Sequence, residues 1–296
     1  MFKSGFITII GRPNVGKSTL LNTVVGQKIA GVSDKAQTTR NKITFIYTES
    51  DFQAVFLDTP GIQDPKNKLG DYMLKTSKDT LSEVDVITYM VDTSKSPGRV
   101  DKNILKMLTA LNHKTPVILL INKIDTIVKE ELLALIENYS AMDLFDEIIP
   151  ISALENDGVA HYLDTLKTYL PEGPQYYPED LVTDQPEKFV VSELIREKAL
   201  RFLSEEVPHG VAVAIESMKW REDKAICDVE ATIYVERDSH KAIVIGKGGK
   251  MLKKIGTAAR REIELLLDIQ VNLRLWVKVE KNWREKDLKL KNFGYE

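Results

Sequence analysis

The stretch that decides the fold is Gly11-Arg-Pro-Asn-Val-Gly-Lys-Ser18, which fits the pattern G-x-x-x-x-G-K-[ST]. It follows the apolar run Phe6–Ile10, which predicts a buried strand, and it opens a helical pattern that continues to about Val25. In this context backbone N–H groups and a helix N-terminus surround phosphate oxygens, and glycines let the backbone come close to them. The stretch therefore predicts a nucleotide phosphate site.

Two side chains of this loop have chemistry suited to phosphate and metal. Lys17 supplies a point charge for the β- and γ-phosphates, and the hydroxyl of Ser18 is a ligand for Mg²⁺. The nucleotide-binding residues predicted here are Gly11, Arg12, Pro13, Asn14, Val15, Gly16, Lys17, Ser18 and Thr19.

A second motif selects the base. Asn122-Lys-Ile-Asp125 directly follows the apolar strand pattern Val117–Ile121, at the end of a strand where open α/β sheets bind ligands. The carboxylate of Asp125 accepts two hydrogen bonds from guanine, whereas adenine would leave it desolvated and unpaired. Backbone N–H groups after the next strand are placed to contact the guanine oxygen. The predicted base site is Asn122, Lys123, Ile124, Asp125, Ser152, Ala153 and Leu154.

Two further segments predict a site that senses the γ-phosphate. Asp58-Thr-Pro-Gly61 follows a strand pattern, and Ala36-Gln-Thr-Thr-Arg40 lies between the first helix and a predicted hairpin. Asp58 supports Mg²⁺ through water, Thr39 caps the metal in the triphosphate state, and the Gly61 N–H reaches the γ-phosphate. The second loop adds Asp58, Thr59, Pro60, Gly61 and Ile62 to the nucleotide site. The predicted metal residues are Ser18, Thr39 and Asp58, and the catalytic ones are Lys17, Thr39 and Gly61.

Together these motifs resemble the translation-factor-related branch of small GTPases over residues 5 to about 170. Ras-like members place a water-orienting glutamine after the glycine of Asp58–Gly61, but this chain has Ile62, which cannot orient water. Either intrinsic hydrolysis is slow or other groups hold the water. One hypothesis is that Asn14 helps to hold K⁺ between the phosphates, where the ion neutralises developing charge. The other is that Asn14 is only a hydrogen-bonding loop residue.

The pattern of strands and helices predicts two domains. Residues 1–170 alternate strand and helix patterns, which predicts an α/β P-loop GTPase domain with a mostly parallel sheet. Prolines and glycines in 171–187 predict an extended linker. Residues 188–296 read as α-β-β-α-α-β with a frayed charged tail, and the helix at their start is expected to reach Glu206.

The second domain carries Gly246-Lys-Gly-Gly249 between two helical patterns, within an α+β frame typical of a type II KH domain. From His240 to Lys291 the chain has 14 Lys and Arg against six Asp and Glu, although the whole chain has a net charge of −3. A basic region in an acidic chain favours a polyanionic partner. The predicted RNA-binding residues are Ile245, Gly246, Lys247, Gly248, Gly249, Lys250, Lys253 and Lys254. Trp276 and Trp283 are expected to be core or anchor residues rather than base-stacking ones.

Across essentially its whole length the chain resembles the Era family of bacterial GTPases. The matching stretches are Gly11–Ser18, Ala36–Arg40, Asp58–Gly61, Asn122–Asp125, Ser192–Lys198 and Leu275–Val279. The resemblance implies binding near the 3′ end of 16S ribosomal RNA, a role in assembly of the 30S subunit from its precursor, and peripheral contact with the inner face of the cell membrane. No role on DNA is expected.

The amino-acid composition excludes several other classes of protein. With one cysteine the chain has neither an intrachain disulfide nor a cysteine cluster for zinc, which fits a reducing, cytoplasmic location. No apolar run approaches the roughly 20 residues of a membrane span. Two alternatives stay open: a GTPase timer that releases a protein partner, and a GTPase that acts on an anionic membrane surface through its basic region.

Overall fold

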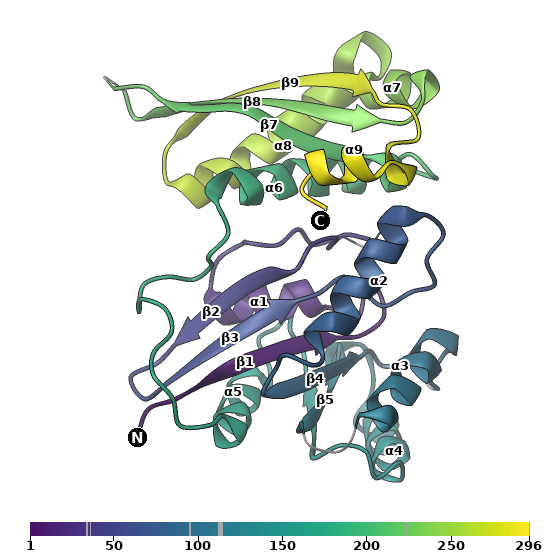
Figure 1. The fold of residues 1–296 in the computed structure, drawn as a ribbon, viewed down its shortest axis with the longest axis vertical. Coiled ribbons are helices and arrows are strands. Elements are labelled where there is room, and N and C mark those ends of the chain that lie inside the picture. Colours follow the sequence, from purple (N-terminus) through teal and green to yellow (C-terminus); the bar gives the residue numbers. More distant parts are fainter. Residues whose placement is uncertain (34, 36, 95, 112–114, 223, 296) are drawn as a thin grey trace. The chain divides into compact units, whose positions relative to one another are not determined.

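A computed structural model describes residues 1–33, 35, 37–94, 96–111, 115–222 and 224–295 (Figure 1). Ala36, which begins the Ala36–Arg40 motif, lies outside the described residues. Contacts divide the chain into two units. The first contains Met1–Gln27, Thr39–Pro65 and Met73–Asp184, and the second contains Lys28–Thr38, Lys66–Tyr72 and Gln185–Glu296. Two short segments of the N-terminal half, Lys28–Thr38 and Lys66–Tyr72, thus group with the C-terminal unit.

The first unit is built on a six-stranded sheet in the order β2-β3-β1-β4-β5-β6. Only the β2–β3 pair is antiparallel, which confirms the predicted hairpin, and the other neighbours are parallel. The strands are β1 (Lys3–Ile10), β2 (Ile43–Thr48), β3 (Phe52–Asp58), β4 (Val86–Val91), β5 (Val117–Asn122) and β6 (Glu147–Ile151). Strands β3, β4 and β5 are buried along their whole length, as expected for a sheet covered on both faces.

Helices cover both faces of this sheet. Ile104 of α3 and Leu135 of α4 share a core with Tyr89 of β4, whereas Tyr162 of α5 lies against the opposite face and hydrogen-bonds Thr88 at 2.7 Å. The helices are α1 (Lys17–Val25), α2 (Lys68–Thr80), α3 (Arg99–Ala110), α4 (Lys129–Ser140) and α5 (Val159–Tyr169), with a 3₁₀ turn η1 (Ile124–Thr126). Because the parallel strands point the same way, the loops after β1, β3, β4, β5 and β6 gather at one edge.

The segment predicted as a linker, residues 171–187, is extended but is held along the first unit for most of its length. Gln53 Oε1 accepts a hydrogen bond of 2.8 Å from the N–H of Tyr176. The N–H of Ile46 donates to the carbonyl of Val182 at 2.9 Å. The segment therefore follows the β2–β3 edge of the sheet.

The second unit is a three-stranded sheet with helices packed on one face. Strand β8 pairs antiparallel with β7 and parallel with β9, in the order β7-β8-β9. The elements are α6 (Glu187–Phe202), η2 (Pro208–Gly210), β7 (Ala212–Trp220), β8 (Ile226–Val235), α7 (Asp238–Ile245), η3 (Lys247–Gly249), α8 (Lys250–Leu267) and β9 (Gln270–Val279). Leu194, Val229, Val244 and Ile255 from four of these elements share one core. The predicted α-β-β-α-α-β order is confirmed.

Two expectations for this unit were wrong. Helix α6 ends at Phe202 rather than Glu206, because the chain turns to extended backbone at Leu203, which is buried. The tail is not frayed: it forms η4 (Trp283–Glu285) and α9 (Asp287–Asn292). Trp283 holds it in place, since its side chain is fully buried and its indole N–H donates to the carbonyl of Gly210 at 2.9 Å.

In the described part of the chain, no helix has both the length and the apolar character needed to cross a bilayer.

Candidate nucleotide site and nucleic-acid groove

The loop Gly11–Ser18 joins β1 to α1 at the edge where the parallel strands end. Gly16 has a φ of 109°, and a Cβ there would lie 2.1 Å from Nδ2 of Asn122, so only glycine fits. Asn122 is itself buried. Its Nδ2 donates to the carbonyl of Val15 at 2.7 Å, and its Oδ1 accepts from the N–H of Ala153 at 2.9 Å. Asn122 thus ties the phosphate loop to the loop after β6.

Lys17 lies inside the phosphate loop with only 6 % of its surface exposed. Its ammonium donates to the carbonyls of Gly11 and Arg12, both at 3.3 Å. Burial lowers the pKa of Lys17, and the nearby charge of Asp58 opposes that shift. A buried ammonium group that has only carbonyl oxygens as partners is stabilised strongly when an anion binds beside it. This is the behaviour expected of a lysine in a phosphate site.

Three oxygen-bearing side chains meet beside Lys17. Ser18 Oγ lies 2.8 Å from Asp58 Oδ2 and 3.0 Å from Thr39 Oγ1, and Thr39 Oγ1 lies 3.3 Å from the same Asp58 oxygen. The other carboxylate oxygen, Asp58 Oδ1, is buried and has no hydrogen-bond partner among the described residues. Burial raises the pKa of Asp58 to about 6, although Lys17 and the two hydroxyls favour its charged form.

These oxygens suit Mg²⁺, which prefers hard oxygen ligands and keeps several waters. The unsatisfied Asp58 Oδ1 is the acceptor that a metal-bound water needs. Ser18 and Thr39 would ligate the ion, and Asp58 would support it. The structure therefore brings together all three residues that the sequence predicted for the metal.

The base-binding motif is held in shape by polar contacts. Asp125 Oδ1 accepts a hydrogen bond of 2.6 Å from Ser152 Oγ, which orients the carboxylate. Lys123 adopts a left-handed φ of 68°, and its ammonium donates to the carbonyl of Asn14 at 2.8 Å. Leu154, by contrast, is 74 % exposed. The residues Asn122–Asp125 and Ser152–Leu154 thus form one cluster next to the phosphate loop.

The loop after β3 lies against the phosphate loop. A Cβ on Gly61 would lie 3.0 Å from the backbone nitrogen of Pro13, and the N–H of Ile62 donates to the carbonyl of Gly11 at 3.2 Å. The Ile62 side chain is 4 % exposed and belongs to the core with α3 and α4. The Ile62 side chain is therefore part of the core and is not open to the phosphate site.

Arg12 has a set of partners that the sequence did not predict. Its guanidinium bonds Asp92 and also lies 2.8 Å from Ser94 Oγ and 3.5 Å from Asp101. The carboxylate of Asp101 also accepts from the N–H of Gly98 at 3.0 Å, as the first turn of α3 begins. The phosphate loop is thereby anchored to the ends of β4 and α3. No local pattern could reveal this, because the partners lie about 80 residues from Arg12.

In the second unit, the glycine loop between α7 and α8 opens onto a groove. Gly246 has a φ of 71°, and a Cβ there would lie 2.7 Å from the Cβ of Met251, so glycine is required. The groove has a volume of ≈ 400 Å³. It is lined by Gly249 of η3, by Leu252, Lys253, Gly256, Thr257 and Arg260 of α8, and by Leu273 and Leu275 of β9. An apolar floor with a basic, glycine-rich rim suits an unstacked base and its backbone.

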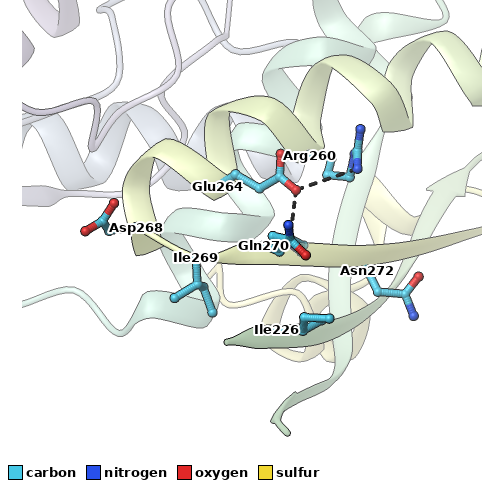
Figure 2. A pocket seen from close by; sticks show the side chains of 8 residues that line it. Ile226, Arg260, Glu264, Asp268, Ile269, Gln270 and Asn272 are labelled. Atoms are coloured by element: carbon cyan, nitrogen blue, oxygen red, sulfur yellow. Dashed lines mark hydrogen bonds and ion pairs between the residues drawn. The ribbon is translucent and has the colours of Figure 1, made fainter. Parts of the chain in front are cut away.

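A second hollow of ≈ 760 Å³ shares one lining residue, Arg260, with the groove. Figure 2 shows Arg260 and Glu264 of α8 above Gln270 and Asn272 of β9. Glu264 lies 3.6 Å from the guanidinium of Arg260 and accepts from the N–H of Val271 at 3.0 Å. The second hollow has acidic as well as basic lining residues, whereas the glycine loop is surrounded by lysines. The positive charge suited to phosphate is therefore concentrated near the glycine loop.

The predicted RNA-binding lysines do not all face the groove. Lys247 and Lys250 are exposed around the glycine loop, and Lys253 lines the groove. Lys254, one residue on, turns about 100° around the helix, and its ammonium lies 4.3 Å from the ring centroid of Phe202 on α6. The Ile245 side chain is half-buried and packs against the core. Gly246, Gly248 and Gly249 all have positive φ.

Comparison with known proteins agrees with this geometry. A family model described as "50S ribosome-binding GTPase" matches residues 6–123, and a KH domain model matches residues 206–284. A crystal structure of Era in complex with MgGDPNP and nucleotides 1506–1542 of 16S ribosomal RNA is 40 % identical, with a TM-score of 0.94. The match covers 100 % of this chain and 99 % of that one.

A second structure, of a variant of Aquifex aeolicus Era bound to GDP.AlF4-, is also 40 % identical. Its TM-score is 0.94, and 99 % of each chain is covered. The chain therefore has a P-loop GTPase domain followed by a C-terminal KH domain, and it is a GTPase.

Proposed function

This chain belongs to the Era family of GTPases, and from that premise we propose that it binds 16S ribosomal RNA near its 3′ end and assists assembly of the 30S subunit. The observation that carries the proposal is the glycine-rimmed groove of the KH domain in the same chain as a complete guanine-nucleotide site. The 40 % identical Era structure holds nucleotides 1506–1542 of 16S ribosomal RNA. The matching GTPase model names the large subunit instead, but it matches only residues 6–123.

In the nucleotide site each group has a distinct part in hydrolysis. Lys17 and the loop N–H groups stabilise the negative charge that builds on the phosphate oxygens. Asp125 and Ser152 fix the base. Ser18 and Thr39 would ligate Mg²⁺, and Asp58 would accept a hydrogen bond from a metal-bound water. When bound, the ion would neutralise further negative charge on the phosphates. Gly61 brings a backbone N–H to the γ-phosphate.

K⁺ dependence is a finer part of the proposal. The Ile62 side chain is buried and cannot orient the attacking water, so we propose that a cation at the phosphate loop provides additional charge neutralisation. Asn14 is in that loop with a left-handed φ of 66°, and its carbonyl is already engaged by Lys123. We assign the Asn14 side-chain amide to K⁺ because it belongs to the loop that surrounds the phosphates. Turnover should be faster in K⁺ than in Na⁺, and equal rates would contradict this assignment.

The RNA proposal is tested by mutation in the glycine loop. Gly248 has open space around its Cβ position and a φ of 60°, so Gly248→Asp adds charge with only backbone strain. The variant should lose affinity for an RNA fragment from the 3′ end of 16S while hydrolysing GTP normally. If it binds both the fragment and ribosome precursors like the parent, the groove is not the RNA site. Loss of RNA binding with precursor recruitment intact would instead favour a protein partner.

We further propose that the protein acts in the cytoplasm, where its ribosomal RNA partner is made, and contacts membranes only peripherally. The basic region from His240 to Lys291 suits either RNA or anionic lipid. Liposome flotation with and without competitor RNA separates these uses. RNA should displace the protein from lipid if one basic surface serves both.

A further inference from the structure

Helix α6 buries an unusual number of charges. Glu193, Arg196, Glu197 and Lys198 are exposed by 7 %, 1 %, 2 % and 2 %, respectively. Removing ionised groups from water is costly unless each is paired and hydrogen-bonded. The charges of α6 must therefore be matched by other groups in the second unit.

Much of the match comes from Lys28–Thr38, the segment between α1 and β2 that groups with the second unit. The Lys28 ammonium lies 2.9 Å from Glu197 and 3.2 Å from Glu262 of α8. Lys198 lies 3.1 Å from Glu197 and 2.9 Å from Glu262, completing an alternating set of charges. The backbone also comes close, since a Cβ on Gly31 would lie 3.1 Å from the Cβ of Glu197.

Arg196 holds the end of this segment by its backbone. It is paired with Glu193, and its guanidinium donates to the carbonyl of Gln37 at 3.3 Å and to the carbonyl of Thr38. A planar guanidinium bonding two successive carbonyls fixes their orientation, which a lysine ammonium does less well. Because both acceptors are backbone carbonyls, this contact depends on the backbone conformation at Gln37 and Thr38 and not on their side chains.

The next residue is Thr39, whose hydroxyl lies 3.0 Å from Ser18 Oγ and 3.3 Å from Asp58 Oδ2. The peptide unit between Thr38 and Thr39 is planar, so holding the Thr38 carbonyl also fixes the nitrogen of Thr39 and restrains its Cα. We propose that Arg196 is a positioning residue for GTP hydrolysis, keeping the Thr39 hydroxyl within the metal-binding group. The proposal rests on the GTPase activity and on the metal role of Thr39, and not on RNA binding.

The test compares Arg196→Gln and Arg196→Lys with Arg201→Ala, a matched control because Arg201 is an exposed arginine on the same helix. Single-turnover hydrolysis, its Mg²⁺ dependence and GDP affinity are measured for each full-length protein. Arg196→Gln should slow hydrolysis about 10- to 100-fold and raise the Mg²⁺ concentration needed for half-maximal rate. Arg196→Lys should fall between Arg196→Gln and the parent, and Arg201→Ala should match the parent.

GDP affinity separates positioning from folding. It should stay within about twofold of the parent, since losing one positioning contact need not disturb the base and phosphate loops. Arg196→Lys keeps a positive charge beside Glu193. If Arg196→Gln does not fold, the same measurements on Arg196→Lys test the proposal. A parallel loss of GDP affinity and rate in Arg196→Lys would show a structural role only and overturn the proposal.

A double-mutant cycle tests whether Arg196 acts through Thr39. In a Thr39→Ala background the hydroxyl is gone, so adding Arg196→Gln should change the rate by less than about twofold. If Arg196→Gln lowers the rate by the same factor in both backgrounds, Arg196 does not act through Thr39 and the proposal fails.

Discussion

Asp58 shows, at the scale of one residue, how burial prepares a side chain for a metal. Its carboxylate accepts from Ser18 and Thr39, yet Oδ1 has no partner among the described residues and burial raises its pKa to about 6. The folded pKa therefore lies above the unfolded value near 4. Without metal, the charged carboxylate destabilises the fold at pH values above about 6, and protonation relieves this penalty as the pH falls towards 4.

Asp58→Asn removes that penalty while keeping an oxygen that accepts from Ser18. In EDTA at pH 8 the variant should be more stable than the parent by about 2–3 kcal/mol. The difference should shrink as the pH is lowered from 7 to 4. Urea unfolding at a series of pH values measures it, and a difference that stays constant with pH would contradict the assignment. The variant should also lose Mg²⁺-dependent hydrolysis.

Asp125 sets the choice of base at the same scale. It is oriented by Ser152 and suited to accept two hydrogen bonds from guanine. Replacing it with alanine should weaken GTP binding by about 10²-fold or more, because hydrogen bonds to a charged group are worth about 1.5–3 kcal/mol each. Titration with fluorescent GTP and ATP analogues checks this. ATP affinity should not fall, so a loss common to both nucleotides would point to misfolding instead.

At the scale of elements, α8 uses one face for the hydrophobic core and another face for the groove. Ile255, Ala259 and Ile263 recur every four residues and enter the core, whereas Lys253 and Arg260 line the groove. The sequence predicted a helix after the glycine loop because its apolar period is strong, and the structure has this helix at Lys250–Leu267. It did not separate Lys253 from Lys254, since both follow a glycine loop in a basic region.

The two neighbouring lysines give a matched pair of variants. Lys253→Ala should weaken RNA binding and reduce the slope of log affinity against log salt by about one, because one phosphate contact is lost. Lys254→Ala should leave that slope unchanged, since its ammonium lies over Phe202. Binding titrations at several salt concentrations compare them. Equal changes in slope would show that both lysines contact phosphate.

At the scale of the whole molecule, sequence reasoning succeeded where a function resides in one continuous stretch. The loop Gly11–Ser18 and the glycine loop at Gly246 are local devices with fixed spacing. It failed where the partner lies far along the chain, as with Arg12 and Asp101, or Lys28 and Glu197. The order of the tail was missed for the same reason, because its indole contact from Trp283 is to Gly210, far along the chain. The expectation that Trp283 is a core or anchor residue was correct.

Because a GTPase domain and a KH domain share this chain, we propose that nucleotide state and RNA affinity are coupled. Thr39 and Gly61 lie in the loops that a γ-phosphate would order. Thr39 also directly follows the segment held by α6 of the KH-containing unit. Any such coupling is reciprocal in binding free energy, so RNA should favour the triphosphate state to the same extent as that state favours RNA.

The most direct test is to measure the affinity of the full-length protein for a fragment from the 3′ end of 16S ribosomal RNA, with GDP and with GDPNP at saturating Mg²⁺. We expect the two affinities to differ by about fivefold or more, and the difference to disappear in Thr39→Ala. The same affinity with both nucleotides would show that the nucleotide state does not control RNA binding.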